Sequence, residues 1–215
     1  MRRVVPAVLL LSLAATAHAD PALDAEEIEF VRLINEYRAS KDLPCISVSV
    51  TANVAADWMS REMGEQAFFD HNEPPCEKGV CTGRDPFARM IDLGHTGWGA
   101  AGENIAAGYP NAAAVFAGWR SSPGHNANML HPRFTAMGIA RVEVPGSPYG
   151  VYWTNDFSDN PADAWDCNEG LPPEGFPLAE DEDDGKTRGG CSAAASAPSL
   201  LGVALLALLR RQRGR

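Results

Sequence analysis

Three residues that can bind a metal or move protons stand out in this 215-residue sequence: His71 in "FFDHN", Glu103 in "AAGENIAAG" and His125 in "SSPGHNANML". Glu103 is the only acid in the mostly apolar run between Gly97 and Phe116. A buried carboxylate needs a partner, because burial alone raises its pKa or destabilises the fold. The two imidazoles are the obvious partners.

Two imidazoles and one carboxylate are the ligand set of many catalytic zinc centres, in which a fourth position is open to water. The same side chains could instead form a satisfied polar cluster in a pocket wall, and the sequence contains no His-Glu-x-x-His helix that would favour the metal. Both interpretations stay open on spacing alone. His95 and His131 lie in loop contexts beside Gly and Pro, and we interpret them as surface residues.

Helical periodicity dominates the first half of the chain. Asp24 and Glu27 form a capping-box pattern before a predicted amphipathic helix over 25–39. Thr51 is expected to cap a second helix that ends near Gly64. Two more helices are predicted over 85–93, with Phe87, Met90 and Ile91 on one face, and over 111–121, with Val115, Phe116 and Trp119 inward.

The pattern changes after Pro132. Residues 137–144 and 149–157 are rich in β-branched and aromatic residues, and a Pro-Gly-Ser-Pro turn separates them. This arrangement predicts a β-hairpin.

The two ends of the chain read as processing signals. Residues 1–19 combine Arg2 and Arg3, an apolar stretch and a small-residue cleavage site, which predicts a secretory signal peptide. Residues 191–215 combine Cys191, an uncharged apolar run and a terminal arginine cluster, which predicts at least a C-terminal membrane anchor.

Between these signals we expect one domain over 20–160, followed by an acidic, Pro-rich linker over 161–190. The net charge of the whole chain is −10, and six arginines lie in the two ends, which leaves −16 for residues 20–191. Such an acidic exported domain is not expected to bind nucleic acid, and we expect membrane contact only through the tail.

Four cysteines remain in the part expected to fold, and an even number in an exported chain favours disulfides. Cys76 and Cys81 could close a local loop, and Cys45 and Cys167 would then join the start of the domain to its end. Other pairings stay possible on sequence alone.

Five short motifs in order resemble the CAP/SCP superfamily of cysteine-rich secretory, antigen and pathogenesis-related proteins, and most of all its bacterial branch. The motifs are "LINEYR", "FFDHN", "GENIA", "GWRSSPGHNANML" and "YGVYWTNDF", and together they span about residues 25–158. The resemblance implies an α+β fold, a three-layer α-β-α sandwich with a small antiparallel sheet.

The resemblance also implies a cavity lined by two His and, in many members, two Glu. His71, Glu103 and His125 fall on three of these positions, and Ser122 stands where the second Glu is expected. This departure puts in doubt any mechanism that needs two carboxylates, and it leaves Glu103 as the only acid that we place in the site. Ser122 and Asn104 are expected at the cavity rim, and Ser122 is more readily a helix cap before Pro123 than a nucleophile.

The C-terminal segment resembles the Cys-containing sorting tails of myxobacterial surface proteins. That resemblance implies cleavage and lipid attachment at Cys191, so that the mature protein is anchored at the cell surface.

Three functions remain open. The first is an exported, non-enzymatic binding protein whose cavity holds a divalent metal, zinc above others, beside a small-molecule or polymeric cell-envelope ligand. The second is a zinc-dependent hydrolase of peptide or cell-wall substrates, with Glu103 as ligand or general base. The third is a structural cell-surface module. A monomer is expected in each case, and the sequence favours binding over catalysis.

Overall fold

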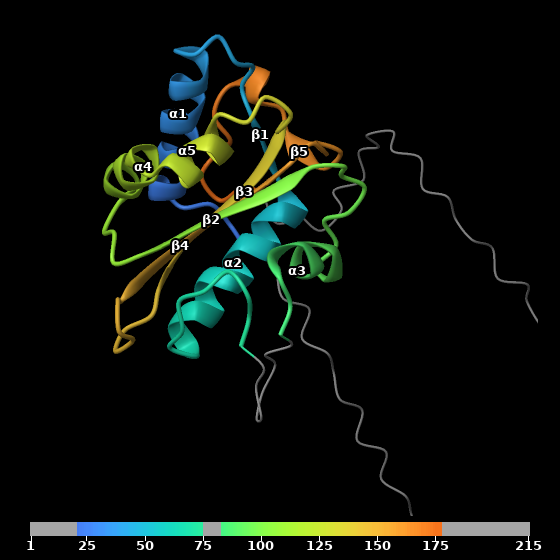
Figure 1. Ribbon diagram of the computed structural model, residues 1–215. Coiled ribbons are helices and arrows are strands. Elements are labelled where there is room, and N and C mark those ends of the chain that lie inside the picture. Colours follow the sequence, from blue (N-terminus) through green and yellow to red (C-terminus); the bar gives the residue numbers. More distant parts are fainter. Residues whose placement is uncertain (1–20, 75–82, 178–215) are drawn as a thin grey trace, which may run out of the picture. The chain divides into compact units, whose positions relative to one another are not determined.

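A computed structural model describes residues 21–74 and 83–177 (Figure 1). Five helices and five strands follow in chain order. Their bounds are α1 Ala25–Ala39, β1 Ser47–Ser49, α2 Val50–Glu65, α3 Pro86–Asp92, β2 Ala101–Ala107, α4 Ala112–Ser121, α5 Pro123–Met129, β3 Ala136–Glu143, β4 Val151–Ser158 and β5 Ala164–Trp165. One 3₁₀ turn, Cys167–Glu169, comes last.

The five strands form one sheet in the order β2-β4-β3-β1-β5, in which only the β1–β3 pair is parallel. Helices α1, α4 and α5 cover one face of the sheet, and α2 and α3 cover the other (Figure 1). The predicted three-layer α-β-α sandwich is therefore confirmed. Strands β3 and β4 are buried on both faces because each face carries helices.

Helix α1 occupies the predicted residues. Asp24 accepts hydrogen bonds from the main-chain N–H groups of Glu26 and Glu27, and the Glu27 carboxylate accepts one from the Asp24 N–H, which completes the capping box. On its inner face Phe30 packs edge-on against Trp119 of α4, with ring centroids 5.2 Å apart. This aromatic pair fixes α1 against α4 above the sheet.

Helix α2 begins two residues earlier than expected. Its N-cap is Ser49, whose Oγ accepts a hydrogen bond from the Ala52 N–H at 3.1 Å, so the prediction of Thr51 as the cap is wrong. The helix lies close to β3 because Gly138 has no side chain: a Cβ there would lie 2.1 Å from the Ala52 carbonyl oxygen.

Strands β3 and β4 form the predicted antiparallel hairpin. The "AGENIAA" segment, for which the sequence suggested only a cavity wall, is β2, the edge strand paired with β4. Alternation along β2 turns Ile105 toward Met59 and Met63 of α2 and turns Ala106 toward the opposite core. Residues of β2 therefore reach both faces of the sheet at its edge.

Helix α3 forms within the predicted range, but its apolar residues do not share one buried face. Met90 is fully buried, whereas Phe87 and Ile91 are 42% and 50% exposed. The buried positions of this short helix are taken by Pro86, Met90 and Arg89. A charged residue thus occupies the inner face that periodicity alone assigned to apolar residues.

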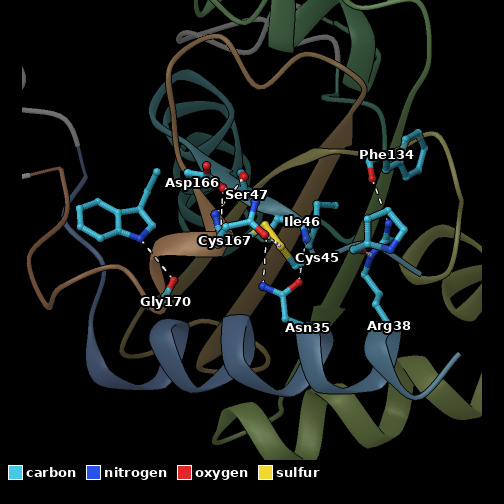
Figure 2. The surroundings of a disulfide bond; sticks show 12 residues. Asn35, Arg38, Cys45, Ile46, Ser47, Phe134, Asp166, Cys167 and Gly170 are labelled. Atoms are coloured by element: carbon cyan, nitrogen blue, oxygen red, sulfur yellow. Dashed lines mark hydrogen bonds between the residues drawn. A yellow bond between two sulfur atoms is a disulfide. The ribbon is translucent and has the colours of Figure 1, made fainter. Parts of the chain in front are cut away.

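The chain beyond residue 160 returns to the domain. Strand β5 pairs with β1, and a disulfide joins Cys45 to Cys167, as predicted (Figure 2). Nearby, the fully buried guanidinium of Arg38 donates to main-chain carbonyl oxygens, among them that of Phe134 at 3.0 Å. Folding therefore extends at least to residue 177, into the segment expected as linker.

Several expectations concern residues outside the described ranges: the signal peptide over 1–19, a disulfide between Cys76 and Cys81, and the tail with Cys191. Among the helices of 21–74 and 83–177, none is long and apolar enough to cross a bilayer.

Candidate functional site at the edge strand

Glu103 of β2 and His71 of the loop after α2 are directly paired. His71 Nδ1 lies 2.7 Å from Glu103 Oε1. The Glu103 side chain is almost fully buried, whereas that of His71 is 48% exposed. The hydrogen bond to Glu103 raises the pKa of His71, although partial burial opposes it. The pair therefore joins a buried carboxylate to an imidazole that reaches solvent.

The other oxygen of Glu103 is bound by Arg89, a residue that the sequence did not single out. Arg89 lies on the inner face of α3, fully buried, and its Nη2 donates to Glu103 Oε2. Its Nη1 lies 3.4 Å from the main-chain oxygen of His71 and 3.9 Å from Glu73 Oε1. Both carboxylate oxygens of Glu103 are thus engaged by side chains from two other segments.

A second acid also lies in the site. Asp156 of β4 is the cross-strand partner of Glu103, and its side chain is completely buried. Neither of its carboxylate oxygens accepts a hydrogen bond within the described residues, and the Glu103 carboxylate is near enough to accept one from a protonated Asp156. Burial, reinforced by the negative charge of Glu103, raises the pKa of Asp156 well above its usual range. The expectation that Glu103 is the only acid of the site is therefore wrong.

His125 approaches from the opposite face of the sheet. It lies on α5, and its main-chain oxygen accepts a hydrogen bond from Asn104 Nδ2 at 3.1 Å. Burial and the positive charge of His71 lower the pKa of His125. The two imidazoles are therefore close enough to influence each other across the edge strand. Asn104, expected at the cavity rim, is fully buried beneath His125 and is held by Asn128 as well.

A groove of about 320 Å³ lies beside His125. Its lining residues are Phe69, Ile105, Ala106, Ala107, Tyr109, Gly118, Trp119, Ser122, His125 and Tyr149. Gly118 admits the Tyr109 ring, because a Cβ at this position would lie 2.7 Å from its hydroxyl oxygen. Ser122 occupies the N-cap position of α5, but its hydroxyl makes no capping hydrogen bond. The Ser122 side chain is therefore available to the groove rather than committed to the helix.

The donor set fits a metal only in part. Within residues 21–74 and 83–177 no three His, Cys, Asp or Glu side chains are grouped as a metal ion requires. Glu103 has both oxygens engaged, one of them by a cation, so its chemistry suits it to orient His71 rather than to bind metal itself. His71 Nε2 and the His125 ring remain as suitable nitrogen donors.

His95 is not the surface residue that its loop context suggested. Only 1% of it is exposed, and its ring nitrogens face hydroxyl groups: Nδ1 lies 2.9 Å from Thr51 Oγ1, and Nε2 lies 2.7 Å from Ser158 Oγ. Asp163 accepts hydrogen bonds from Ser49 Oγ, Thr51 Oγ1 and the Thr51 N–H at 2.6–2.8 Å. We call these five residues the His95 cluster, and we call His71, Glu73, Arg89, Glu103 and Asp156 the His71 cluster.

Comparison with solved structures agrees with this architecture. An extracellular protein containing an SCP domain from Bacillus anthracis (strain Ames) is 25% identical with a TM-score of 0.53, covering 63% of this chain and 40% of that one. An outer surface protein from Borrelia burgdorferi shares the fold at 17% identity with a TM-score of 0.54, covering 66% of this chain and 99% of that one.

Sequence comparison identifies the family. The uncharacterized protein YkwD of Bacillus subtilis (strain 168) is 32% identical over 142 residues, which make up 66% of this chain and 50% of that protein. The chain thus spans about half the length of this relative. The profile of the cysteine-rich secretory protein family, CAP, matches residues 31–157. Because that match covers more than half of the sequence, the chain belongs to the CAP family.

Proposed function

We propose that the protein is an exported, surface-anchored binding module in which His71 and His125 hold a divalent metal, zinc above others, beside a ligand groove. The observation that carries the proposal is the His71–Glu103 pair. A carboxylate that accepts from Nδ1–H fixes the imidazole tautomer and leaves Nε2 free to bind metal. His71 Nε2 has no hydrogen-bond partner among the described residues, and His125 supplies the second imidazole across β2.

The groove supports an uncharged ligand. Its described lining contains no Asp, Glu, Lys or Arg, and His125 has a lowered pKa that favours the neutral ring near pH 7. Phe69 and Tyr149 are about half exposed and lie with ring centroids 6.0 Å apart. Aromatic walls with a few polar groups, here the Ser122 hydroxyl and the His125 ring, are typical of sites for neutral organic molecules. The metal would then lie at the end of the groove where His125 lies.

Binding is a better proposal than hydrolysis. A general base must be free to take a proton from a bound water. Glu103 instead holds His71 with one oxygen and Arg89 with the other. Zinc-dependent hydrolysis would require Glu103 to leave one of these partners.

Export and anchoring rest on the sequence and on the relatives. The predicted signal over 1–19 agrees with the extracellular SCP-domain protein that shares this fold. We propose that Cys191 carries the anchor after removal of the tail. Mass spectrometry of the mature C-terminus tests this, and an intact Arg215 in the surface protein would contradict it.

Metal analysis of protein purified without chelator tests the site. We expect about one zinc per chain in the wild type and less than about a tenth of that in His71→Ala/His125→Ala. His131→Ala is the matched control and should keep its zinc, since His131 stacks on Phe134 outside the site. Equal zinc in all three proteins would refute the proposed metal site. Mass spectrometry of molecules released from the native protein would identify the groove ligand.

A further inference from the structure

Arg89 is a cation buried among three acids. Its side chain has no exposed surface, and Glu73, Glu103 and Asp156 are 3%, 7% and 0% exposed. Glu73 has a second cation, because Arg84 binds it through Nε and Nη2 at 3.0–3.2 Å. Arg89 is therefore the principal cation for Glu103, and for Asp156 behind it. Removing one partner of such a buried pair leaves an uncompensated charge.

With Arg89 in place, no three acids of the described residues are grouped as a metal ion requires, but Glu103 and Asp156 are cross-strand neighbours that would lose this cation in its absence. Buried carboxylates close together bind hard cations such as Mg²⁺, Ca²⁺ and Mn²⁺, which prefer oxygen ligands. The acidic chain would attract such ions. The guanidinium of Arg89 is charged at every accessible pH, so Arg89 remains the cation beside these acids.

Arg89 also determines where Glu103 points. It binds Oε2, and the other oxygen, Oε1, is left facing His71 Nδ1. The same guanidinium reaches the main-chain oxygen of His71 at 3.4 Å, so it contacts both members of the pair. An ion approaching Glu103 would meet this positive charge at close range.

We propose that Arg89 is the positioning and selectivity residue of the site: it holds Glu103 as the orienting partner of His71 and keeps hard divalent cations away from the Glu73, Glu103 and Asp156 carboxylates. The site then offers two imidazole nitrogens, which favours zinc and similar ions over magnesium, calcium and manganese. This inference rests on the proposed function for the identity of the bound metal. The placement of Glu103 and the exclusion of hard cations do not depend on that metal.

The first test needs no metal. At a pH high enough to deprotonate His71, whose pKa is raised by Glu103, ¹⁵N NMR of metal-free protein should show its remaining proton on Nδ1 in the wild type and in Arg89→Lys, which keeps a cation. In Arg89→Met, Glu103 loses its fixed orientation and the His71 tautomers become mixed. Arg61→Met is the matched control, since Arg61 is half exposed on α2 and its one ion pair within residues 21–74 and 83–177 is with Asp57. An unchanged Nδ1–H tautomer in folded Arg89→Met would overturn the positioning role.

The second test measures Mn²⁺ binding by water-proton relaxation. We expect Arg89→Met to bind Mn²⁺ at least about tenfold more tightly than the wild type, and Arg89→Met/Glu103→Gln to lose the gain. If Arg89→Met does not fold, Arg89→Gln/Asp156→Asn, which removes one acid with the cation, takes its place in both tests. Mn²⁺ affinity within about twofold of the wild type in the folded variant would overturn the selectivity role.

The two proposals can fail separately. If the wild type binds no zinc but Arg89→Met gains Glu103-dependent Mn²⁺ binding, the proposed zinc site fails and the role of Arg89 stands. If the wild type binds zinc but folded Arg89→Met keeps the Nδ1–H tautomer of His71 and gains no Mn²⁺ affinity, Arg89 neither positions Glu103 nor excludes hard cations. The role of Arg89 then fails and the zinc site stands.

Discussion

The His71 cluster and the His95 cluster each place an imidazole among buried polar residues, and they differ in access and in hydrogen bonding. His95 is buried, and hydroxyl groups face both of its ring nitrogens. His71 is half exposed, and within the described chain its Nε2 has no hydrogen-bond partner and the two carboxylate oxygens of Asp156 accept no hydrogen bond. Satisfied polar groups stabilise a fold, whereas unsatisfied ones are retained at a cost that function can explain.

The comparison also separates two uses of a carboxylate beside histidine. Asp163 accepts three hydrogen bonds from Ser49 and Thr51 and joins the loop before β5 to the start of α2. Glu103 receives a cation on one oxygen and an imidazole on the other, next to a groove. The hydrogen bonds of Asp163 therefore hold two segments of the fold together, whereas those of Glu103 hold the His71 ring toward solvent.

The largest expected effect is the loss of stability in His95→Ala. The change removes an imidazole bound to Thr51 and Ser158 and leaves a buried cavity, so the free energy of unfolding should fall by about 3 kcal/mol. His71→Ala should cost less than about 1 kcal/mol in metal-free protein, because that side chain is half exposed. Urea denaturation measures both.

The same two variants should rank in the opposite order when their zinc content is measured. His95→Ala should keep its zinc after correction for the folded fraction, and His71→Ala should lose it. A folded His95→Ala protein without zinc would show that the two clusters are not functionally distinct.

The sequence predicted the residues that local patterns or ordered motifs mark, and it missed those that only contacts between distant segments bring into a cluster. The α1 capping box, the β3–β4 hairpin and the choice of His71, Glu103 and His125 rested on local patterns or ordered motifs, which one chain displays directly. Four cysteines in an exported chain indicated disulfides but left the pairing open, and the structure selects Cys45–Cys167.

Arg89, Asp156 and His95 were missed for a common physical reason. Each is buried by segments distant in sequence: α3 carries Arg89 beneath β2, and the β2–β4 register sets Asp156 opposite Glu103. His95 follows a glycine in a loop, and the hydroxyl groups that face its ring come from the distant residues Ser49, Thr51 and Ser158. One usable signal existed, an acid within the aromatic strand "YWTNDF", where burial on both faces makes a carboxylate unusual.

Lowering the pH is expected to reduce folding stability by an intermediate amount. Burial favours a raised pKa for Asp163, but hydrogen bonds from Ser49 and Thr51 outweigh it and lower the pKa below its ordinary 3.8. The corresponding stability is present above that pH and is lost as the pH falls through the folded value. Burial lowers the pKa of His95 below 6.5 despite the charge of Asp163, so its contribution is also present at high pH and is lost on acidification.

Acidification should therefore lower the stability of the fold through both Asp163 and His95. The wild type should lose more stability than Asp163→Asn/His95→Gln as the pH falls from 7 to 3, first through His95 below its ordinary 6.5 and then through Asp163 below 3.8. Urea denaturation at each pH measures the difference, in which the titration of all other groups cancels. Parallel pH profiles would show that acid acts on the protein elsewhere.

The smallest effect is expected at Ser122, on the groove side of the molecule. Replacing a capping serine by alanine usually costs about 1 kcal/mol, but Ser122 Oγ makes no capping bond, so Ser122→Ala should change stability by less than about 0.5 kcal/mol. Asn111→Ala is the matched control, because Asn111 Oδ1 accepts from the Ala114 N–H at 2.9 Å and should show the usual loss. Thermal denaturation compares the two variants. An equal loss in both would make the Ser122 hydroxyl structural and remove it from the groove.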